Sequence, residues 1–310
     1  MNAAAECKDL QSTADFLGFA PQHLYYLVEA PENFYVSIEI PKRSDPTQFR
    51  TLEIPRTELK GVQKAIYRKI LSEHVFDDCV HSYVSSRSII TAAREFCSGK
   101  AVLKLDIENF FPTISFKRVL GLFKSFGFTP AAAYILARLT TVNDRIAQGA
   151  PTSPVISNLI VRGMDVGMKA LARTWEMKYL RYSDDIFFYK HKNFNHPKLT
   201  TFAQKIITDA GFTANGDKTK YYAKGVPRTT LGLLTHGDSP KIPGRQRRIY
   251  RSLFFKASRN VHWADQNKDR LRGIAEWYKC VYGKDDTYLQ YRQVLQNVAL
   301  IRIHDSYQSN

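Results

Sequence analysis

The sequence predicts a mixed α+β fold, because strand patterns and helical patterns alternate along its 310 residues. Over 34–40 apolar residues alternate with other side chains, which is typical of a strand with one buried face. Over 58–73 they recur at helical spacing instead, for example at Leu59, Val62 and Ile66. A basic amphipathic pattern over 245–259 predicts a further helix near the C-terminus. These patterns favour neither an all-helical nor an all-strand protein.

The first hundred residues are predicted to combine helices with one hairpin. A helix is expected over 11–29, and a second one over 58–73. Between them, 34–40 and 49–54 are predicted to be two strands. The residues from Pro41 to Gln48 include two prolines, Ser44 and Asp45, and are predicted to form the hairpin tip.

The middle of the chain is predicted to hold a buried strand, several helices and a second hairpin. Residues 101–107 (AVLKLDI) have the apolar character of a short buried strand. Residues 177–189 predict a strand, a tight turn at Ser183-Asp184-Asp185, and a second strand. The other elements expected here are helices over 116–126, 131–139, 151–168 and 201–210, and short strands over 221–223 and 229–235.

Composition excludes several classes of protein. The chain is 44% hydrophobic and 24% charged, which is ordinary for a globular protein and excludes disordered, collagenous and fibrous chains. It has no run of 18 uncharged apolar residues, and its first residues lack an apolar signal core. The four cysteines lie far apart and show no zinc-binding spacing. We therefore expect reduced thiols, no membrane partner and a cytoplasmic location.

The charge balance predicts an anionic partner. Lys and Arg number 45 and Asp and Glu number 29, which gives a net charge of +16. Seven Lys and Arg residues fall within 241–259 alone, interleaved with aromatic and aliphatic residues. Nucleic acid is the most plausible partner for such a chain, through phosphate contacts and counterion release.

Three carboxylates form the strongest candidate for catalysis. Asp106 ends a predicted strand, while Asp184 and Asp185 lie at the turn of a predicted hairpin. Two divalent cations about 4 Å apart would neutralise such a set and clamp the oxygens of a phosphoryl transfer, and oxygen ligands suit Mg²⁺. An Asp-Asp pair alone is more often only a polar turn. Here the aromatic flanks around Tyr182 and Phe187 make a bare acidic pair costly, which favours the metal interpretation.

A second candidate is the segment from Gln148 to Asn158. Its two prolines fix the backbone, and Gly149 permits the close approach of a ligand. Ser153 and Asn158 are then expected on the first turns of a helix, beside a bound nucleotide or template. The alternative is an ordinary helix that begins at a proline and has a serine cap.

Together these segments resemble the core motifs of reverse transcriptases, in the family's order. The resemblance rests on Asp106-x-x-x-Phe110-Phe111, on Gln148-Gly149-Ala150-Pro151-x-Ser153-Pro154-x-x-x-Asn158 and on Tyr182-Ser183-Asp184-Asp185. Further matching segments are Arg50 to Pro55, Arg87-Ser88-Ile89, Gly211 to Thr219 and Leu231-Gly232-Leu233. The resemblance covers roughly residues 29–259, and the ordered set is far more specific than any single motif.

The resemblance implies a right-hand polymerase fold with fingers, a palm and a helical thumb, in which the palm is an antiparallel sheet with packed helices. It assigns 1–100 to an N-terminal segment and the fingers, 101–237 to the palm, and 238–310 to the basic thumb. Part of 116–150 belongs either to the palm or to the fingers.

It also implies a role for each matching residue. Asp106, Asp184 and Asp185 are expected to bind two Mg²⁺ ions, with the Ile107 carbonyl as a backbone ligand. The residues expected to bind the deoxynucleoside triphosphate are Arg50, Arg87, Phe111, Gln148 and Lys218. Among these, the Phe111 ring would exclude a ribose 2′-hydroxyl, and Phe110 would belong to the core unless the chain turns after Asn109. The residues expected to contact nucleic acid are Ser153, Asn158, Tyr182, Ser183, Arg245, Arg247, Arg248 and Arg251.

Among reverse transcriptases, the chain looks most like the bacterial retron-type group. Two elements depart from that group: Ala92-Ala93-Arg94-Glu95-Phe96 stands where an Asn-Ala-x-x-His element is usual, and Thr229-Thr230-Leu231-Gly232 where Val-Thr-Gly is usual. Related defence-associated reverse transcriptases therefore stay open. The implied function is an RNA-directed DNA polymerase that copies a cognate structured non-coding RNA into cDNA in anti-phage defence, with an effector protein as partner. The alternatives are a polymerase that makes untemplated or protein-primed DNA, and a non-catalytic RNA-binding scaffold.

Overall fold

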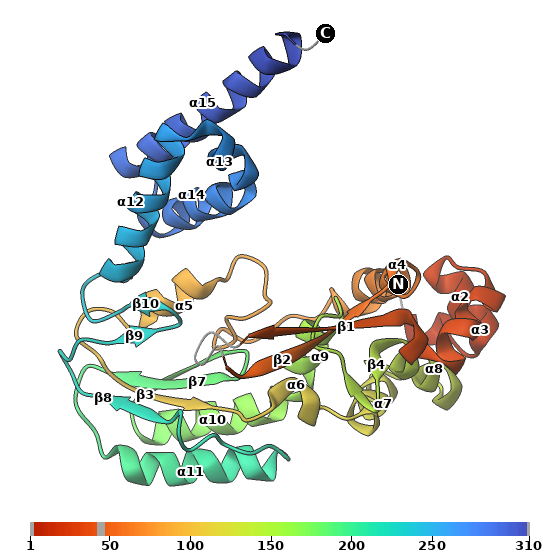
Figure 1. Cartoon of the computed structure of the whole chain (residues 1–310). Coiled ribbons are helices and arrows are strands. Elements are labelled where there is room, and N and C mark those ends of the chain that lie inside the picture. Colours follow the sequence, from red (N-terminus) through yellow and green to blue (C-terminus); the bar gives the residue numbers. More distant parts are fainter. Residues whose placement is uncertain (1–2, 42–46, 309–310) are drawn as a thin grey trace. The chain divides into compact units, whose positions relative to one another are not determined.

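The computed structural model describes residues 3–41 and 47–308 and contains two compact units (Figure 1). The first comprises Met1–Ser86, Leu103–Phe188 and Asn195–Tyr221, and the second Arg87–Val102, Tyr189–Phe194 and Tyr222–Asn310. Helices and strands alternate along the chain, which confirms the predicted α+β class. Most of the predicted hairpin tip, residues 42–46, lies outside the described residues. The division into 1–100, 101–237 and 238–310 stays a prediction.

The first unit begins with short helices where one long helix is predicted. After α1 (Ala3–Glu6), residues 11–29 form most of α2 (Leu10–Leu17) and all of α3 (Pro21–Glu29). The helix stops at Gly18, whose φ of 86° lies in the left-handed region that favours glycine. Pro21 then occupies the first turn of the next helix, where its missing N–H costs nothing.

The predicted hairpin is present as β1 (Tyr35–Pro41) and β2 (Phe49–Pro55). The strands are antiparallel, with Tyr35 opposite Pro55 and Pro41 opposite Phe49. A 3-10 turn, η1 (Pro31–Phe34), precedes the hairpin, and α4 (Thr57–Ile66) and a π-helical turn, η2 (Tyr67–Leu71), follow it.

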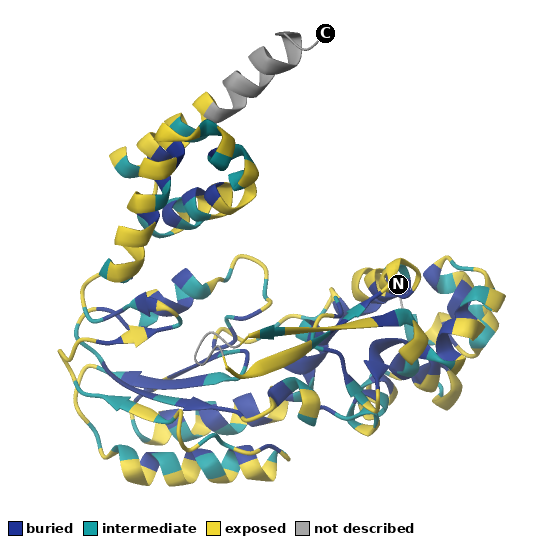
Figure 2. Ribbon diagram, in the orientation of Figure 1, coloured by how far each residue is buried: buried dark blue, intermediate teal, exposed yellow. Residues whose placement is uncertain are grey.

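A four-stranded sheet carries the segments that matter for function. Its order is β6 (Lys178–Tyr182), β7 (Asp185–Lys190), β3 (Ala101–Asp106) and β8 (Lys220–Tyr222). Helices α10 (Arg162–Thr174) and α11 (His196–Asp209) pack together beneath it, and α10 contacts β6 (Figure 1). Figure 2 shows β3 and β7 as mostly buried strands and the outer faces of α10 and α11 as exposed.

The remaining elements of the first unit lie between β3 and β6 in the sequence. They are α6 (Phe110–Thr113), α7 (Phe116–Ser125), α8 (Pro130–Thr140), the strand pair β4 (Thr141–Val142) and β5 (Arg145–Ile146), and α9 (Ser153–Ile160). The helix predicted over 151–168 is in fact two, because Val161 leaves the helical conformation between α9 and α10.

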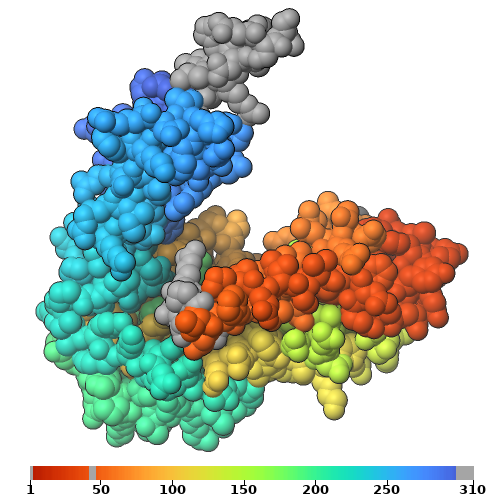
Figure 3. All heavy atoms as spheres, in the orientation of Figure 1, coloured from red at the N-terminus to blue at the C-terminus, as the bar shows by residue number. Residues whose placement is uncertain are grey.

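The second unit is mainly helical. It contains α5 (Ile89–Glu95), the hairpin of β9 (Thr229–Thr230) and β10 (Leu233–Leu234), α12 (Gly244–Arg259), α13 (Val261–Gln266), α14 (Lys268–Tyr282) and α15 (Asp286–Gln308). Its core includes Tyr250, Phe254, Tyr278 and Tyr291, and the rings of Phe254 and Tyr291 stack 3.8 Å apart. In Figure 3 the atoms of α12–α14 form one continuous blue group. None of the helices within the described ranges has the length and apolarity of a membrane span.

Candidate active site

The three predicted catalytic carboxylates lie at one end of the central sheet. Asp106 is the last residue of β3, while Asp184 and Asp185 lie where the chain turns from β6 into β7. Since β3 and β7 are neighbours in the sheet, this turn lies beside the end of β3. The Ile107 N–H donates to the Asp184 carbonyl over 3.0 Å and ties the two segments together.

The turn has an unusual backbone at Ser183. Its φ is 59°, in the left-handed region that residues with a side chain seldom adopt. The Ser183 side chain is almost buried, and its hydroxyl lies 3.2 Å from the Tyr83 hydroxyl. Non-glycine residues hold such conformations where surrounding contacts enforce them, often at functional sites.

Two lysines provide counter-charges for the carboxylates. Lys218 Nζ lies 3.0 and 3.3 Å from the two carboxylate oxygens of Asp106, and Lys104 Nζ lies 2.7 Å from Asp185 Oδ1. Lys218 reaches this position because the segment before it runs along the end of β3, where the Asn215 N–H donates to the Asp106 carbonyl. Sequence reasoning places Lys218 near the substrate phosphates and does not assign Lys104 any role.

Burial and mutual repulsion raise proton affinity at the turn. Burial, and next the charge of Asp106, raise the pKa of Asp184. Burial raises the pKa of Asp185 to about 6, although the charge of Lys104 opposes the rise. Burial lowers the pKa of Lys218, but its hydrogen bond and attraction to Asp106 outweigh that effect and raise it. Three carboxylates and the two lysines paired with them give the site a formal net charge of 2 − 3 = −1.

These carboxylates suit a hard divalent cation. All three provide oxygen donors, which Mg²⁺ prefers, and the raised pKa values of Asp184 and Asp185 show that added positive charge would be favourable here. The predicted backbone ligand, Ile107, is buried beside the turn. The donor set thus fits the predicted ions.

Asp77, Asp78 and Cys79 form another cluster, whose ligand atoms all lie within 4.8 Å of one another. Lys169 already occupies it, since its Nζ lies 2.6 and 2.7 Å from the two Asp77 oxygens and 3.3 Å from Asp78 Oδ1. Burial also raises the pKa of the Cys79 thiol, which disfavours the thiolate that a metal would require. This cluster is best explained as an ion pair.

Aromatic rings flank the carboxylates. Asn109 has a φ of 46° and the chain turns there into α6, yet Phe110 is buried and Phe111 is partly exposed. The Phe111 ring lies edge-on to Tyr83, with 6.5 Å between centroids, and Tyr83 in turn reaches Ser183. Phe111 is thus the more accessible of the two rings, and its role as a steric gate stays a prediction.

The glycine of the Gln148 segment has a different neighbour from the one expected. The Glu53 N–H donates to the Gln148 carbonyl over 3.0 Å, which docks the segment against β2. A Cβ on Gly149 would lie 2.8 Å from the Glu53 carbonyl oxygen, and the φ of Gly149 is 139°. The chain's own backbone therefore makes a close approach that requires glycine at this position.

The other predicted residues are spread over both units. Arg50 is exposed on β2, and Tyr182 is partly exposed at the end of β6. Ser153 and Asn158 are buried in α9. Both polar atoms of the Asn158 amide bond within the protein, which favours a structural role over the predicted contact with nucleic acid. In the second unit, Arg87 precedes α5, and the basic residues Arg245, Arg247, Arg248 and Arg251 are exposed on α12.

Sequence reasoning missed four residues that contact this site or support it. They are Lys104, Tyr83, Ser82 and Arg181. A signal existed for Lys104 and Arg181, because each is a charged residue flanked by apolar or aromatic residues within a strand and so required a partner. Ser82 and Tyr83 carried no such signal, since their segment has no regular pattern.

Comparison with known proteins identifies a family for this chain and several relatives. Residues 40–248 match the family described as reverse transcriptase (RNA-dependent DNA polymerase). The chain is similar to the retron Mx65 and retron Mx162 reverse transcriptases of Myxococcus xanthus, at 29% and 28% identity over 82% and 88% of this chain. It is also similar to the retron Ec86 reverse transcriptase of Escherichia coli, at 26% identity over 72% of this chain and 70% of that protein. The predicted retron-type resemblance is thereby confirmed.

The chain spans about two thirds of the length of these curated relatives. The alignment spans 64% of the length of both Myxococcus xanthus proteins. Among solved structures, telomerase from Candida albicans with a fragment of telomeric RNA aligns over 93% of this chain and 58% of that chain. Its TM-score is 0.46 and the identity is 14%, a similarity that does not by itself establish a shared fold.

Proposed function

Because the chain belongs to the reverse transcriptase (RNA-dependent DNA polymerase) family, we propose that it is an RNA-directed DNA polymerase. The observation that carries the proposal is the meeting of Asp106, Asp184 and Asp185 at one end of the central sheet. They come from two separate motifs within the family match, and they hold more negative charge than Lys104 and Lys218 neutralise. Such a site is suited to bind divalent cations, which assist phosphoryl transfer.

Asp106, Asp184 and Asp185 would hold two Mg²⁺ ions, with the Ile107 carbonyl as a further ligand. When bound, such ions lower the pKa of the primer hydroxyl and offset the charge of the departing pyrophosphate. Lys218 lies close enough to Asp106 to exchange that contact for the phosphates of the incoming nucleotide. Lys104, on the strand that carries Asp106, balances the charge of Asp185.

The substrates we propose are deoxynucleoside triphosphates and a structured RNA. Phe111 would exclude the ribose 2′-hydroxyl, and Gln148 would contact the nucleotide, with Arg50 and Arg87 at its phosphates. Tyr182 and Ser183 would lie under the primer end. The exposed arginines of α12, which are Arg245, Arg247, Arg248 and Arg251, would bind the phosphates of the duplex.

We further propose that the template is one cognate non-coding RNA and that the cDNA serves anti-phage defence, which is what the resemblance of the sequence motifs to the retron-type group implies. The test is to sequence all nucleic acid that co-purifies with the protein from its host, with and without RNase treatment. A discrete cDNA joined to one structured RNA supports the proposal. DNA with no matching RNA, or DNA attached to protein, would instead favour untemplated or protein-primed synthesis.

A pair of variants separates catalysis from RNA binding. Asp184→Asn is expected to abolish synthesis and to leave RNA affinity nearly unchanged, because the exposed arginines of α12 are untouched. Neutralising Arg247, Arg248 and Arg251 together is expected to weaken RNA binding and to reduce its salt dependence. Synthesis by Asp184→Asn at the wild-type rate would contradict the catalytic assignment. An unchanged salt slope in the triple variant would contradict the assignment of the α12 surface.

A further inference from the structure

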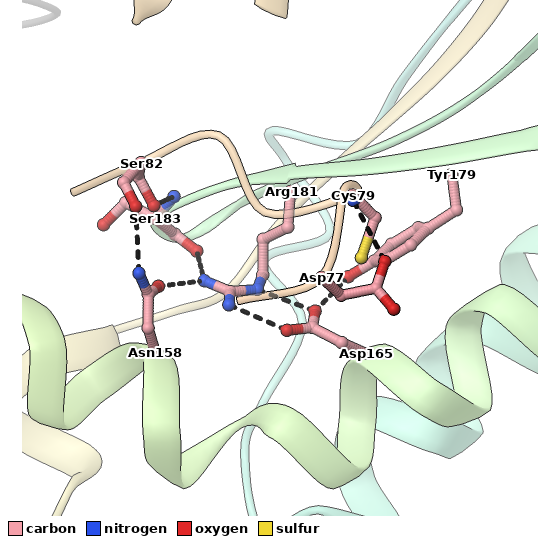
Figure 4. Close-up of polar contacts among 8 residues, drawn as sticks. All are labelled: Asp77, Cys79, Ser82, Asn158, Asp165, Tyr179, Arg181 and Ser183. Atoms are coloured by element: carbon pink, nitrogen blue, oxygen red, sulfur yellow. Dashed lines mark hydrogen bonds and ion pairs between the residues drawn. The ribbon is translucent and has the colours of Figure 1, made fainter. Parts of the chain in front are cut away.

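The peptide groups of Ser183 are held on both sides by side chains from elsewhere in the first unit (Figure 4). Its N–H donates to Ser82 Oγ over 2.8 Å, and its carbonyl accepts from Arg181 Nη1 over 3.2 Å. Ser183 is the residue with a φ of 59°, and Asp184 and Asp185 follow it directly. The conformation of this residue sets the direction in which the chain enters the two carboxylates.

Arg181 is anchored so that it cannot swing away. The side chain is fully buried, and its Nε and Nη2 donate to the two oxygens of Asp165, each over 2.8 Å. The Tyr179 hydroxyl donates to the same carboxylate over 2.6 Å. A buried ion pair is favourable only when its geometry is good and further hydrogen bonds satisfy its remaining atoms, and both conditions hold here.

Asn158 forms hydrogen bonds with both Arg181 and the Ser82 segment. Its Oδ1 accepts from Arg181 Nη1 over 2.9 Å, and its Nδ2 donates to the Ser82 carbonyl over 2.9 Å. Figure 4 shows the amide between the guanidinium and the Ser82 segment. A single side chain from α9 therefore fixes both groups that hold Ser183.

The Ser82 segment is aligned by backbone contacts with β6. The Arg181 N–H donates to the Cys79 carbonyl over 2.8 Å, and the His81 N–H donates to the Arg181 carbonyl over 2.9 Å. The segment thus adds a short parallel bridge to the edge of β6, and this bridge brings Ser82 to the turn.

We propose that Ser82, Asn158 and Arg181 are positioning residues that hold the Ser183 turn, and through it Asp184 and Asp185, in the geometry required for catalysis. The inference rests on the proposed polymerase function and adds residues to which sequence reasoning gave no such role. The turn brings two carboxylates close to Asp106, and like charges repel one another. It also keeps Ser183 in the left-handed region, which is unfavourable for a residue with a side chain. Both features would drive the turn into another conformation unless other contacts held it in place.

The test uses Ser82→Ala in the full chain, which removes one oxygen and leaves the ion pair and the Asn158 bonds intact. Ser157→Ala is the matched control, because Ser157 is also a fully buried serine but its hydroxyl bonds only the Pro154 carbonyl within α9. Two quantities are measured: kcat and KM for deoxynucleotide incorporation on a template-primer, and the Kd for Mn²⁺ from paramagnetic resonance titration without nucleic acid.

Groups that orient metal ligands typically change affinity or activity by roughly 10-fold to 100-fold when removed. We expect Ser82→Ala to lower kcat and to raise the Kd for Mn²⁺ by about tenfold each, with little change in KM. Ser157→Ala is expected to keep both values. Arg181→Lys keeps the charge opposite Asp165 but is too short to hold Ser183 and Asn158, so it should show the same loss.

Wild-type kcat and Mn²⁺ affinity in Ser82→Ala would overturn the inference, and so would equal losses in Ser157→Ala. The proposed function fails separately, if Asp184→Asn retains synthesis. An inactive Asp184→Asn beside a fully active Ser82→Ala therefore rejects the positioning role and leaves the polymerase assignment in place.

Discussion

Replacing Asp185 by Asn is expected to stabilise the protein in the absence of metal while it abolishes DNA synthesis. Asp185 lies beside Asp184 in a turn that is largely but not completely buried, and burial raises its pKa to about 6. In the folded protein the ionised form is thus less favourable than in the unfolded chain. Asn has nearly the same shape and carries no charge, so the substitution removes the electrostatic cost and creates no cavity.

The size of the effect follows from the pKa. The difference between the ordinary value of 3.8 and about 6 corresponds to about 3 kcal/mol at neutral pH, at roughly 1.4 kcal/mol for each tenfold change in proton affinity. Lys104 loses its partner in the variant, but its side chain is 22% exposed and retains contact with water. We therefore expect Asp185→Asn to raise the free energy of unfolding by about 1–3 kcal/mol.

The sign of the pH dependence is fixed by the same values. Between pH 3.8 and about 6 the folded protein binds more protons at Asp185 than the unfolded chain does, so its stability falls as the pH rises through this window. Above the window the cost is fully present. The stability advantage of Asp185→Asn is therefore largest at pH 7–8 and shrinks as the pH approaches 5.

The assay is thermal and urea unfolding in EDTA between pH 5 and 8, with Asp165→Asn as the opposite control. Asp165 is the buried partner of Arg181, so removing its charge leaves a buried guanidinium unpaired and is expected to destabilise by about 3–5 kcal/mol. The reasoning is refuted if Asp185→Asn is no more stable than the wild type at pH 7.5. It is also refuted if the advantage of Asp185→Asn does not shrink as the pH is lowered.

Two further predictions concern neighbouring segments. Phe111→Ala is expected to raise kcat/KM for ribonucleotides relative to deoxynucleotides, because Phe111 is the partly exposed ring beside the turn, and an unchanged ratio in single-nucleotide incorporation would remove the gate role. Gly149→Ala is expected to destabilise by about 1–3 kcal/mol in urea unfolding, because the new methyl group would meet the Glu53 carbonyl and the backbone there disfavours a side chain. Gly163→Ala, whose added carbon would meet nothing within 4 Å, is the control for Gly149→Ala.

The sequence was sufficient to predict which carboxylates would come together. Asp106 ends a strand rich in apolar residues, Asp184 and Asp185 lie in a tight turn between two strands, and the order of the motifs groups these three residues into one site. The α+β class followed from the helix and strand periodicities. Both predictions depend on local pattern and motif order, which a sequence contains directly.

What the sequence could not predict depends on contacts between distant segments. Asn158 was expected to face nucleic acid, but its amide points into a buried network whose other members are Arg181 and Ser82. That network forms because residues 79–81 pair with the edge of β6, and nothing in the local pattern of the segment indicates that pairing. Similarly, the close approach of the β2 backbone to Gly149 has no signal in the local pattern of either segment.

Two groups of charged residues at the central sheet differ in how well their charges are neutralised. Asp165 and Arg181 form an ion pair, so their charges neutralise each other within the fold. Tyr179 donates a further hydrogen bond to Asp165, and Arg181 donates to Asn158 and to the Ser183 carbonyl. A few residues further along the chain, Asp184 and Asp185 share their end of the sheet with Asp106, and Lys104 and Lys218 provide only two positive charges for the three carboxylates. A balanced network gives rigidity, and an unbalanced one gives affinity for cations. Since Arg181 contacts the turn that leads into the two carboxylates, the rigid set supports the reactive one, and weakening the first is expected to weaken cation binding by the second.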